Sequence, residues 1–141
     1  MVSGATILSL AGQPKGVPMR YNIPNQKAIE KNRVLVMSGA DARESSSTDS
    51  GANAVFLGIS STEKVANDGS TSIGAWTKGN FGFAVAPMKG SISGGHMVSL
   101  SGQNLVRPAT AGEILTGSVI GRSISGDKTE NANISVAIGI Y

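Results

Sequence analysis

Residues Asn133–Tyr141 read NISVAIGIY, and this stretch decides the fold class. The large apolar residues Ile134, Val136, Ile138 and Ile140 occupy every second position, with small or polar residues between them. Alternation with a period of two is typical of a half-buried β-strand, whose successive side chains point to opposite faces of a sheet. Small residues on the other face allow a second backbone to approach closely. We therefore predict a strand here that is built into a sheet.

Similar short apolar segments occur from Val34 onward, separated by turns rich in Gly, Ser, Asn and Asp. They are RVLVMS (33–38), AVFLGIS (54–60), FGFAVAP (81–87), HMVSLS (96–101), NLVRP (104–108) and SVIGRSIS (118–125). The chain of 141 residues contains 19 Gly and lacks long runs of helix-forming residues. We predict an all-β fold, namely a small single-domain β-barrel or β-sandwich. A chain of this length buries a core without help from disulfides or metal.

The first third of the sequence differs from the rest. Pro14, Pro18 and Pro24 are spaced so that they block both a helix and a central strand. We therefore predict an extended N-terminal arm over residues 1–33, with at most one helical turn at Gln26–Lys31, and a β-barrel body over residues 34–141. Within the arm, Val2–Leu10 has the composition of an edge strand, or of a strand that is added to a partner's sheet.

Positive charge is concentrated in the arm. Residues 1–43 hold six Lys and Arg against two acids, whereas residues 44–141 hold six against seven. A basic arm on a neutral body favours contact with an acidic surface, although a solvated terminal face explains the charge pattern equally well. The residues that we expect to contact a partner are Lys15, Arg20, Tyr21, Lys27, Lys31 and Arg33.

Two long connections interrupt the apolar segments. Gly39–Asn53 is polar with a Ser-rich centre, and its acids do not have the spacing of an EF-hand, so we predict a mobile surface loop. Ser61–Ser72 contains Asn67-Asp68-Gly69, which predicts a tight turn. Further on, Leu100–Leu105 has the pattern of a hairpin, with Pro108 ending its second strand.

The sequence offers little chemistry. There is no Cys and only one histidine, His96, so we expect no metal site and no cofactor. Neither a nucleophile elbow nor a phosphate-binding glycine motif is present, and Glu113 is the only acid between Asp68 and Asp127. We therefore expect a protein that is not an enzyme. No apolar run approaches the ~20 residues that cross a bilayer, and we expect no membrane partner.

Three aromatic residues are candidates for contacts. Phe81 and Phe83 lie on one face of a predicted strand, where sheet-based nucleic-acid binders place stacking residues, but core packing is the better interpretation. Trp76 is the only Trp and serves either the core or an interface. We assign Trp76, Phe81 and Phe83 to a possible oligomer interface. Because aromatics make up only 4% of the chain, we expect no direct contact with nucleic acid.

Several of these segments together resemble a known family. FGFAVAP is followed by Gly95-His-Met-Val-Ser-Leu100, by Val119-Ile-Gly-Arg122 and by the terminal ISVAIGIY. VFLGI (55–59) is a short apolar segment of the same kind. In the order and composition of these segments, the chain resembles the small capsid decoration (cement) proteins of tailed bacteriophages. The likeness covers about three-quarters of the chain and is strongest over Phe81–Tyr141.

The resemblance implies a function. It implies a non-enzymatic virion protein, made in the host cytoplasm and located on the capsid exterior, that binds the outer surface of the phage head. There it would cement adjacent subunits of the major capsid protein, often as a homotrimer. The alternative is a tail-tube, head–tail connector or other β-sandwich virion assembly protein. A soluble sugar-binding or nucleic-acid-binding β-module is a third hypothesis, which the scarcity of aromatics disfavours.

Overall fold

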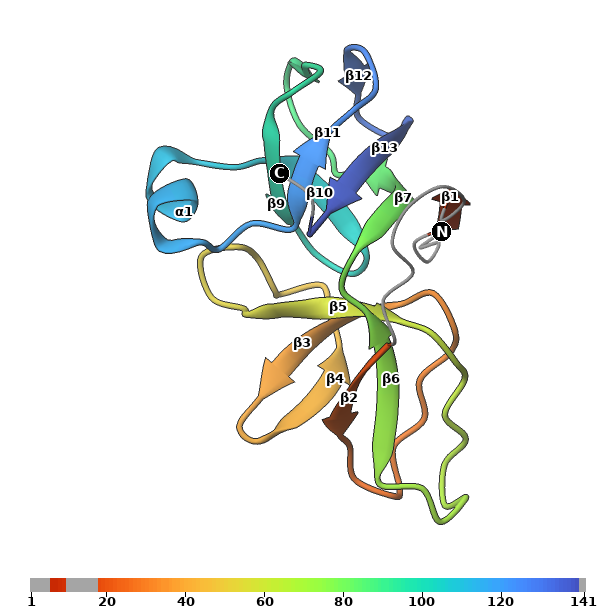
Figure 1. The fold of residues 1–141 in the computed structure, drawn as a ribbon. Coiled ribbons are helices and arrows are strands. Elements are labelled where there is room, and N and C mark those ends of the chain that lie inside the picture. The colour runs from red at the N-terminus through yellow and green to blue at the C-terminus, as the bar shows by residue number, and fades with distance from the viewer. Residues whose placement is uncertain (1–5, 10–17, 140–141) are drawn as a thin grey trace.

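The C-terminal half of the chain closes into a five-stranded β-barrel, seen in the upper part of Figure 1. The structure is a computed structural model that describes residues 6–9 and 18–139. One parallel pair, β7 with β10, joins otherwise antiparallel neighbours, and β13 pairs with β7 to complete the ring. In order around the barrel, the strands are β7 (Gly79–Val85), β10 (Leu105–Pro108), β9 (Met97–Leu100), β11 (Gly121–Ser123) and β13 (Asn133–Ile138).

Three smaller elements accompany the barrel. Strand β1 (Thr6–Ser9) pairs antiparallel with β7, so the expectation of a strand within Val2–Leu10 is confirmed for these four residues. A two-stranded sheet is formed by β8 (Ser91–Ile92) and β12 (Lys128–Thr129). The helix α1 (Ala111–Thr116) lies in the connection between β10 and β11.

A second sheet of five strands occupies the lower part of Figure 1. All of its neighbouring strands run antiparallel. In spatial order they are β2 (Met19–Asn22), β6 (Ser72–Trp76), β5 (Phe56–Ser60), β3 (Val34–Ser38) and β4 (Asp41–Glu44). The all-β prediction is confirmed.

Strand β3 belongs to two hydrophobic cores at once. Val34 and Val36 pack into the barrel core, together with Ile59 from β5, whereas Leu35 between them packs into a second core. The second core is small and consists of Ile23, Ile29, Leu35, Ala42, Ile73 and Ala75. A strand buried on both faces reads as a continuous apolar run rather than an alternating one. This double burial explains the sequence RVLVMS at residues 33–38.

The terminal strand behaves as its alternation predicts. Ile134, Val136 and Ile138 are almost completely buried in the barrel core, whereas Ser135 and Ala137 between them are not part of that core. At Gly121 of β11, an added Cβ would collide with the carbonyl oxygen of Ala137, so only glycine fits there. Ile140 and Tyr141 lie outside the described residues.

The predicted boundary at residue 33 needs correction. Residues 19–22 form β2 and pair with β6, while Ile23 and Ile29 are 2% and 4% exposed in the second core. The prolines that argued against structure lie on either side of β2, at 18 and 24, and β2 is an edge strand, where proline is tolerated. Residues 18–33 are therefore part of the body, and Gln26–Lys31 contains no helical turn.

The two predicted loops are more ordered in structure than expected. Within Gly39–Asn53, residues 41–44 form β4, which pairs with β3 across a turn at Gly39. The prediction of a mobile loop is wrong for this strand, because Ala42 is buried in the second core. The predicted turn at Asn67-Asp68-Gly69 is confirmed, since Asn67 and Gly69 both have positive φ.

Candidate functional site

The predicted contact residues of the N-terminal region have different surroundings in the structure. Arg20 is exposed on β2 and donates to the Ser72 hydroxyl at 2.6 Å, and Arg33 forms an ion pair with Glu30. Lys27 and Lys31 are exposed on the connection between β2 and β3. The remaining two predictions differ: the Tyr21 hydroxyl donates to the Leu57 carbonyl at 3.4 Å, and Lys15 lies outside the described residues.

The second sheet and its connections carry balanced charge. Residues 18–76, which hold the whole second sheet, contain six Lys and Arg and six Asp and Glu. Three of these cations, Arg33, Arg43 and Lys64, form ion pairs with acids of the same region. Among the cations of residues 18–43, Arg33 thus pairs with the nearby Glu30, and Arg43 pairs with Asp49, which comes later in the chain.

The aromatic residues assigned to an interface are core residues instead. Phe81 and Phe83 are 0% and 1% exposed inside the barrel, so neither can contact a second molecule while the barrel is closed. Trp76 is partly buried and packs against the same core. The assignment of Phe81 and Phe83 to an oligomer interface is therefore wrong, and the reason is that β7 turns this face inward to fill the barrel.

One buried carboxylate, Asp49, organises the Ser-rich connection after β4. The Arg43 guanidinium donates to both of its oxygens at 2.6 and 2.8 Å, and the Ser46 amide donates at 2.7 Å. The charged hydrogen bonds from Arg43 and the bond from Ser46 outweigh burial and lower the pKa of Asp49 from 3.8 to about 2. Asp49 is thus an ionised structural group.

A second buried carboxylate, Glu113, anchors α1. The Arg107 guanidinium donates to its oxygens at 2.8 and 2.7 Å, which lowers the pKa of Glu113 from 4.5 to about 2, against the opposing effect of burial. Thr110 and Glu113 also form a capping box, in which each side chain bonds the other residue's backbone N–H. Gly51 packs so closely on this carboxylate that a Cβ there would collide with it.

Polar contacts connect the barrel to the second sheet through Asn104. This residue is fully buried with a φ of 59°, in the turn between β9 and β10. Its side-chain oxygen accepts from the Val34 amide at 2.6 Å, and its side-chain nitrogen donates to Glu44 at 3.0 Å. Its own amide donates to the Ser45 hydroxyl at 3.0 Å. Asn104 therefore joins the β9–β10 turn to both β3 and the end of β4.

Lys64 is a buried cation that holds two connections together. Its ammonium lies 2.8 to 3.2 Å from the carbonyl oxygens of Asn25, Lys27 and Val65, and 2.9 Å from the Asp68 carboxylate. This contact lowers the pKa of Asp68. The backbones of Ile29 and Lys64 also exchange two hydrogen bonds. Lys64 thus fixes the connection before β3 against the connection after β5.

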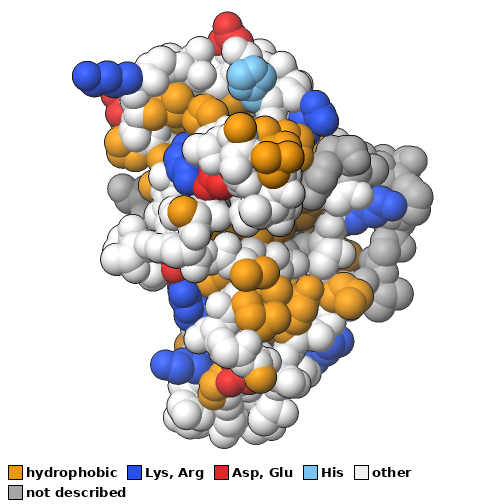
Figure 2. Space-filling view, turned by 90° about the vertical axis from the view of Figure 1, so that its left-hand side faces the viewer, with side chains coloured by type: hydrophobic (Ala, Val, Ile, Leu, Met, Phe, Trp, Pro, Cys, Tyr) orange, Lys and Arg blue, Asp and Glu red, His pale blue; other side chains and the backbone are white. Residues whose placement is uncertain are grey.

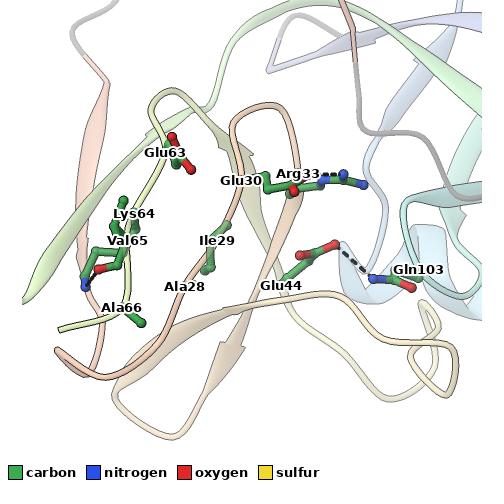
Figure 3. A pocket seen from close by; sticks show the side chains of 10 residues that line it. All are labelled: Ala28, Ile29, Glu30, Arg33, Glu44, Glu63, Lys64, Val65, Ala66 and Gln103. Carbon is green, nitrogen blue, oxygen red and sulfur yellow. Dashed lines mark hydrogen bonds and ion pairs between the residues drawn. The ribbon is translucent and has the colours of Figure 1, made fainter. Parts of the chain in front are cut away.

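These two connections form one wall of an open groove of about 690 Å³, shown in Figure 3. Glu44 and Gln103 lie across from them, and their side chains are hydrogen-bonded at 3.0 Å. The groove is lined by Ala28, Ile29, Glu30, Arg33, Glu44, Glu63, Lys64, Val65, Ala66 and Gln103. Among its charged side chains, Glu30 pairs with Arg33, Glu44 with Gln103, and Lys64 with Asp68, whereas Glu63 is exposed.

Exposed apolar side chains are the other surface feature. Figure 2 shows the side of the molecule that carries α1, where hydrophobic side chains gather in an upper and a lower group. Met37 and Val55 are neighbours, because the Met37 amide donates to the Val55 carbonyl at 3.0 Å. The large apolar residues with the greatest exposure are Met19, Met37, Val55, Val65, Ile114, Leu115 and Ile124.

Neither a metal site nor a membrane helix was found among residues 6–9 and 18–139. No three His, Cys, Asp or Glu side chains in that part of the chain are arranged to hold a metal ion. No helix there is long and apolar enough to cross a membrane.

Several structurally important residues were missed by the sequence interpretation. Thr110-Ala-Gly-Glu113 is a readable capping-box signature that predicts the start of α1, yet the all-β prediction included no helix there. No local pattern predicts the roles of Lys64 and Asn104, because their partners are distant in sequence. Asn25 and Lys27 lie 37 or more residues from Lys64, and the partners of Asn104 lie 59 or more residues away.

No protein-family model matches the chain, and no match was found among curated proteins.

Proposed function

We propose that this chain is a non-enzymatic virion structural protein that binds the outer surface of a phage head and cements adjacent major capsid protein subunits. The proposal rests on the resemblance of its β-segments to capsid decoration proteins, and one structural observation supports it. The buried carboxylates Asp49 and Glu113 serve internal ion pairs, whereas large apolar side chains stay exposed on well-anchored elements. Where such side chains are contiguous, they are typical of surfaces that bind protein.

The pair Met37 and Val55 is the surface that we assign to the capsid. They are 38% and 63% exposed and lie beside each other, where β3 runs alongside the residue that precedes β5. Many copies on a lattice need only weak individual contacts, because repeated sites on one shell raise the effective affinity. A small apolar patch on each copy is therefore sufficient. As a proposal, the protein acts as a homotrimer on the exterior of the virion.

Shells assembled from the major capsid protein of the same genome provide the test. We expect the purified chain to co-sediment with expanded shells and to raise the temperature at which they dissociate. Val55→Asp should reduce binding at least tenfold, because it places a charge in an apolar contact. Ile124→Asp is the matched control, since Ile124 is an exposed apolar residue of the barrel. The proposal would be contradicted if the wild-type chain bound neither unexpanded nor expanded shells.

The tail-tube or connector alternative predicts a different result. A ring or tube subunit forms a stable hexamer and binds tail or portal components rather than the shell. A hexameric mass in solution, together with no binding to shells, would replace the capsid proposal with this alternative.

A further inference from the structure

Strand β7 extends past the end of β10, its neighbour on one side of the barrel. On that side, β10 pairs with β7 at Ala84 and Val85. The earlier part of the same edge pairs with β1, at Asn80, Phe81 and Gly82. The ring of β7, β10, β9, β11 and β13 is complete without β1. β1 is therefore an addition to the edge of β7 and not a member of the ring, as Figure 1 shows at the right of the barrel.

Two residues of β7 direct their backbone groups toward β1. The Val85 amide donates to the carbonyl of Ala132, the residue that precedes β13. Successive backbone groups of a strand point to opposite sides, and β7 and β13 pair at six consecutive positions. The amides and carbonyls of Asn80 and Gly82 therefore point away from β13. An extended segment in the position of β1 can form hydrogen bonds with them.

This edge presents backbone groups more than side chains. Phe81 and Phe83 point into the barrel core, where they are almost completely buried, and Gly82 between them has no side chain. Recognition at such an edge uses main-chain hydrogen bonds to an added strand, which is the mode called β-augmentation. The occupant must be extended and able to donate from its own backbone, but its side chains need not match a pocket.

The chain's own strand fits this edge imperfectly. β1 has four residues, and its register with β7 shifts between Ile7 and Ser9. A shift of this kind leaves a residue unpaired and disrupts the local ladder of hydrogen bonds. β13 has no such shift on the other side of β7. Because β1 is short and irregularly paired, we expect it to open at a lower free energy than the barrel does.

We propose that the edge of β7 at Asn80–Gly82 is a binding site for an extended strand of a partner protein, which replaces β1. The sequence of β1, Thr6-Ile-Leu-Ser9, defines the chemistry of the partner's strand: antiparallel to β7, aliphatic at its centre and free of proline. A partner's strand in regular register gains the pairing that β1 loses at its shift. The site is separate from Met37 and Val55, and its test uses no phage shell, so it can fail without the proposed function failing.

A full-length variant with a released β1 tests the site. Ile7→Pro with Leu8→Pro should free the edge, because proline cannot donate to the ladder, while the ring stays closed. The probe is a fluorescent peptide with the sequence of residues 2–11, and its anisotropy measures binding. The variant should bind it about tenfold more tightly than the wild type, in which β1 occupies the site. The same peptide with both prolines is the matched control and should not bind.

Hydrogen exchange shows where the peptide binds. In the variant, the amides of Asn80 and Gly82 should exchange faster than in the wild type and regain protection when the peptide is added. The Phe81 amide between them points toward β13 and should stay protected throughout, which also shows that the barrel remains folded. Peptide binding that leaves Asn80 and Gly82 unprotected would place the peptide on another edge, such as β2 or β4, and overturn the proposal.

Three further results would overturn it. They are a variant that does not bind the peptide, equal affinity of the variant and the wild type, and self-association of the wild type that the two prolines abolish. The last result, measured by light scattering, would assign this edge to a second copy of the chain instead of a partner protein.

Discussion

The barrel and the second sheet differ in how each is closed. In the barrel, β13 pairs with β7 at six register positions and the sheet returns on itself, which removes its free edges. The second sheet ends at β2 and β4, and its own core contains only six residues. Because Val34, Val36 and Ile59 of the second sheet pack into the barrel core, the second sheet depends on the barrel for one of its faces.

This difference shows how a chain of 141 residues stabilises two sheets. A six-residue core buries too little apolar surface to offset the conformational entropy of ordering a separate domain. By placing Val34 and Val36 on one face of β3 and Leu35 on the other, a single strand contributes to both cores. We infer that the two sheets fold as one cooperative unit. The following predictions test or sharpen this comparison, from the largest expected effect to the smallest.

Deleting residues 1–33 should abolish the folded second sheet. The deletion removes β2 together with Ile23 and Ile29, which are two of the six residues of the second core. This expectation replaces the view of residues 1–33 as a separable arm. Circular dichroism and a thermal scan measure the outcome, with deletion of residues 1–17 as the comparison that keeps β2. If the chain without residues 1–33 still unfolded cooperatively at the wild-type melting temperature, the second sheet would not depend on residues 18–33.

Ile138→Asp should destabilise the barrel by more than about 4 kcal/mol, because it buries an unpaired charge. Ile138 is completely buried and pairs with Gly79 where β13 meets β7. Urea unfolding measures the loss. Asn133→Asp is the matched control, since Asn133 is an exposed residue at the start of the same strand. An unchanged midpoint for Ile138→Asp would show that the buried face of β13 is assigned wrongly.

Leu35→Ala and Ile134→Ala compare the two cores directly. Both residues are buried, Leu35 in the second core and Ile134 in the barrel, and each truncation should cost about 3 kcal/mol. If the sheets are one unit, each variant shifts a single transition that is the same by Trp76 fluorescence and by far-ultraviolet circular dichroism. Two transitions, of which Leu35→Ala moves only one, would show that the sheets unfold separately.

Asn104→Ala tests the polar connection between the sheets. The change leaves the buried Val34 amide and one side of Glu44 without their bonds and should cost about 2 kcal/mol. Asn131→Ala is a close control because Asn131 also has positive φ, at 63°, but is exposed. It measures the backbone cost of alanine alone. Equal losses for the two variants would mean that the side-chain bonds of Asn104 contribute nothing.

The smallest effect is expected from acid. Arg43 and Arg107 lower the pKa of Asp49 and Glu113 to about 2, below their values in the unfolded chain, so their stabilisation is complete above about pH 5. It is lost as the pH falls towards 2, and the melting temperature should fall over this window. Glu113→Gln should make the melting temperature less dependent on pH, because this variant lacks the stabilising Arg107 ion pair already at neutral pH.

The exposed Glu130 provides the control for the acid experiment. Glu130→Gln should keep the wild-type profile of melting temperature against pH. A Glu113→Gln profile as steep as the wild-type one would contradict the role of the Arg107 ion pair.

Local pattern was sufficient for part of this fold and insufficient for the rest. The alternation in Asn133–Tyr141 and the hairpin at Leu100–Leu105 predict β13 and the β9–β10 pair, because period and turn chemistry are encoded locally. The closing of β7 on both β13 and β10, and the double burial of β3, depend on residues distant in sequence. No local signal separates a core strand such as β7 from an interface strand, so Phe81 and Phe83 were misassigned.

The surface could be predicted even less well. Charge along the sequence placed a basic arm where the structure pairs Arg33 with Glu30. The prolines at 18 and 24 were read as breaking structure, although they bracket an edge strand. The capping box that begins α1 is visible in the sequence. The exposure of Leu115 on this helix is not, because it depends on how Arg107 anchors Glu113.

Native-state hydrogen exchange tests the central claim most directly. The backbone amides of Leu35 and Val136 lie in the second sheet and the barrel, respectively. If the two sheets unfold only together, their slowest-exchanging amides should report one common opening free energy, equal to the global free energy of unfolding. A second sheet that opens at a clearly lower free energy than the barrel would contradict the account of one cooperative unit.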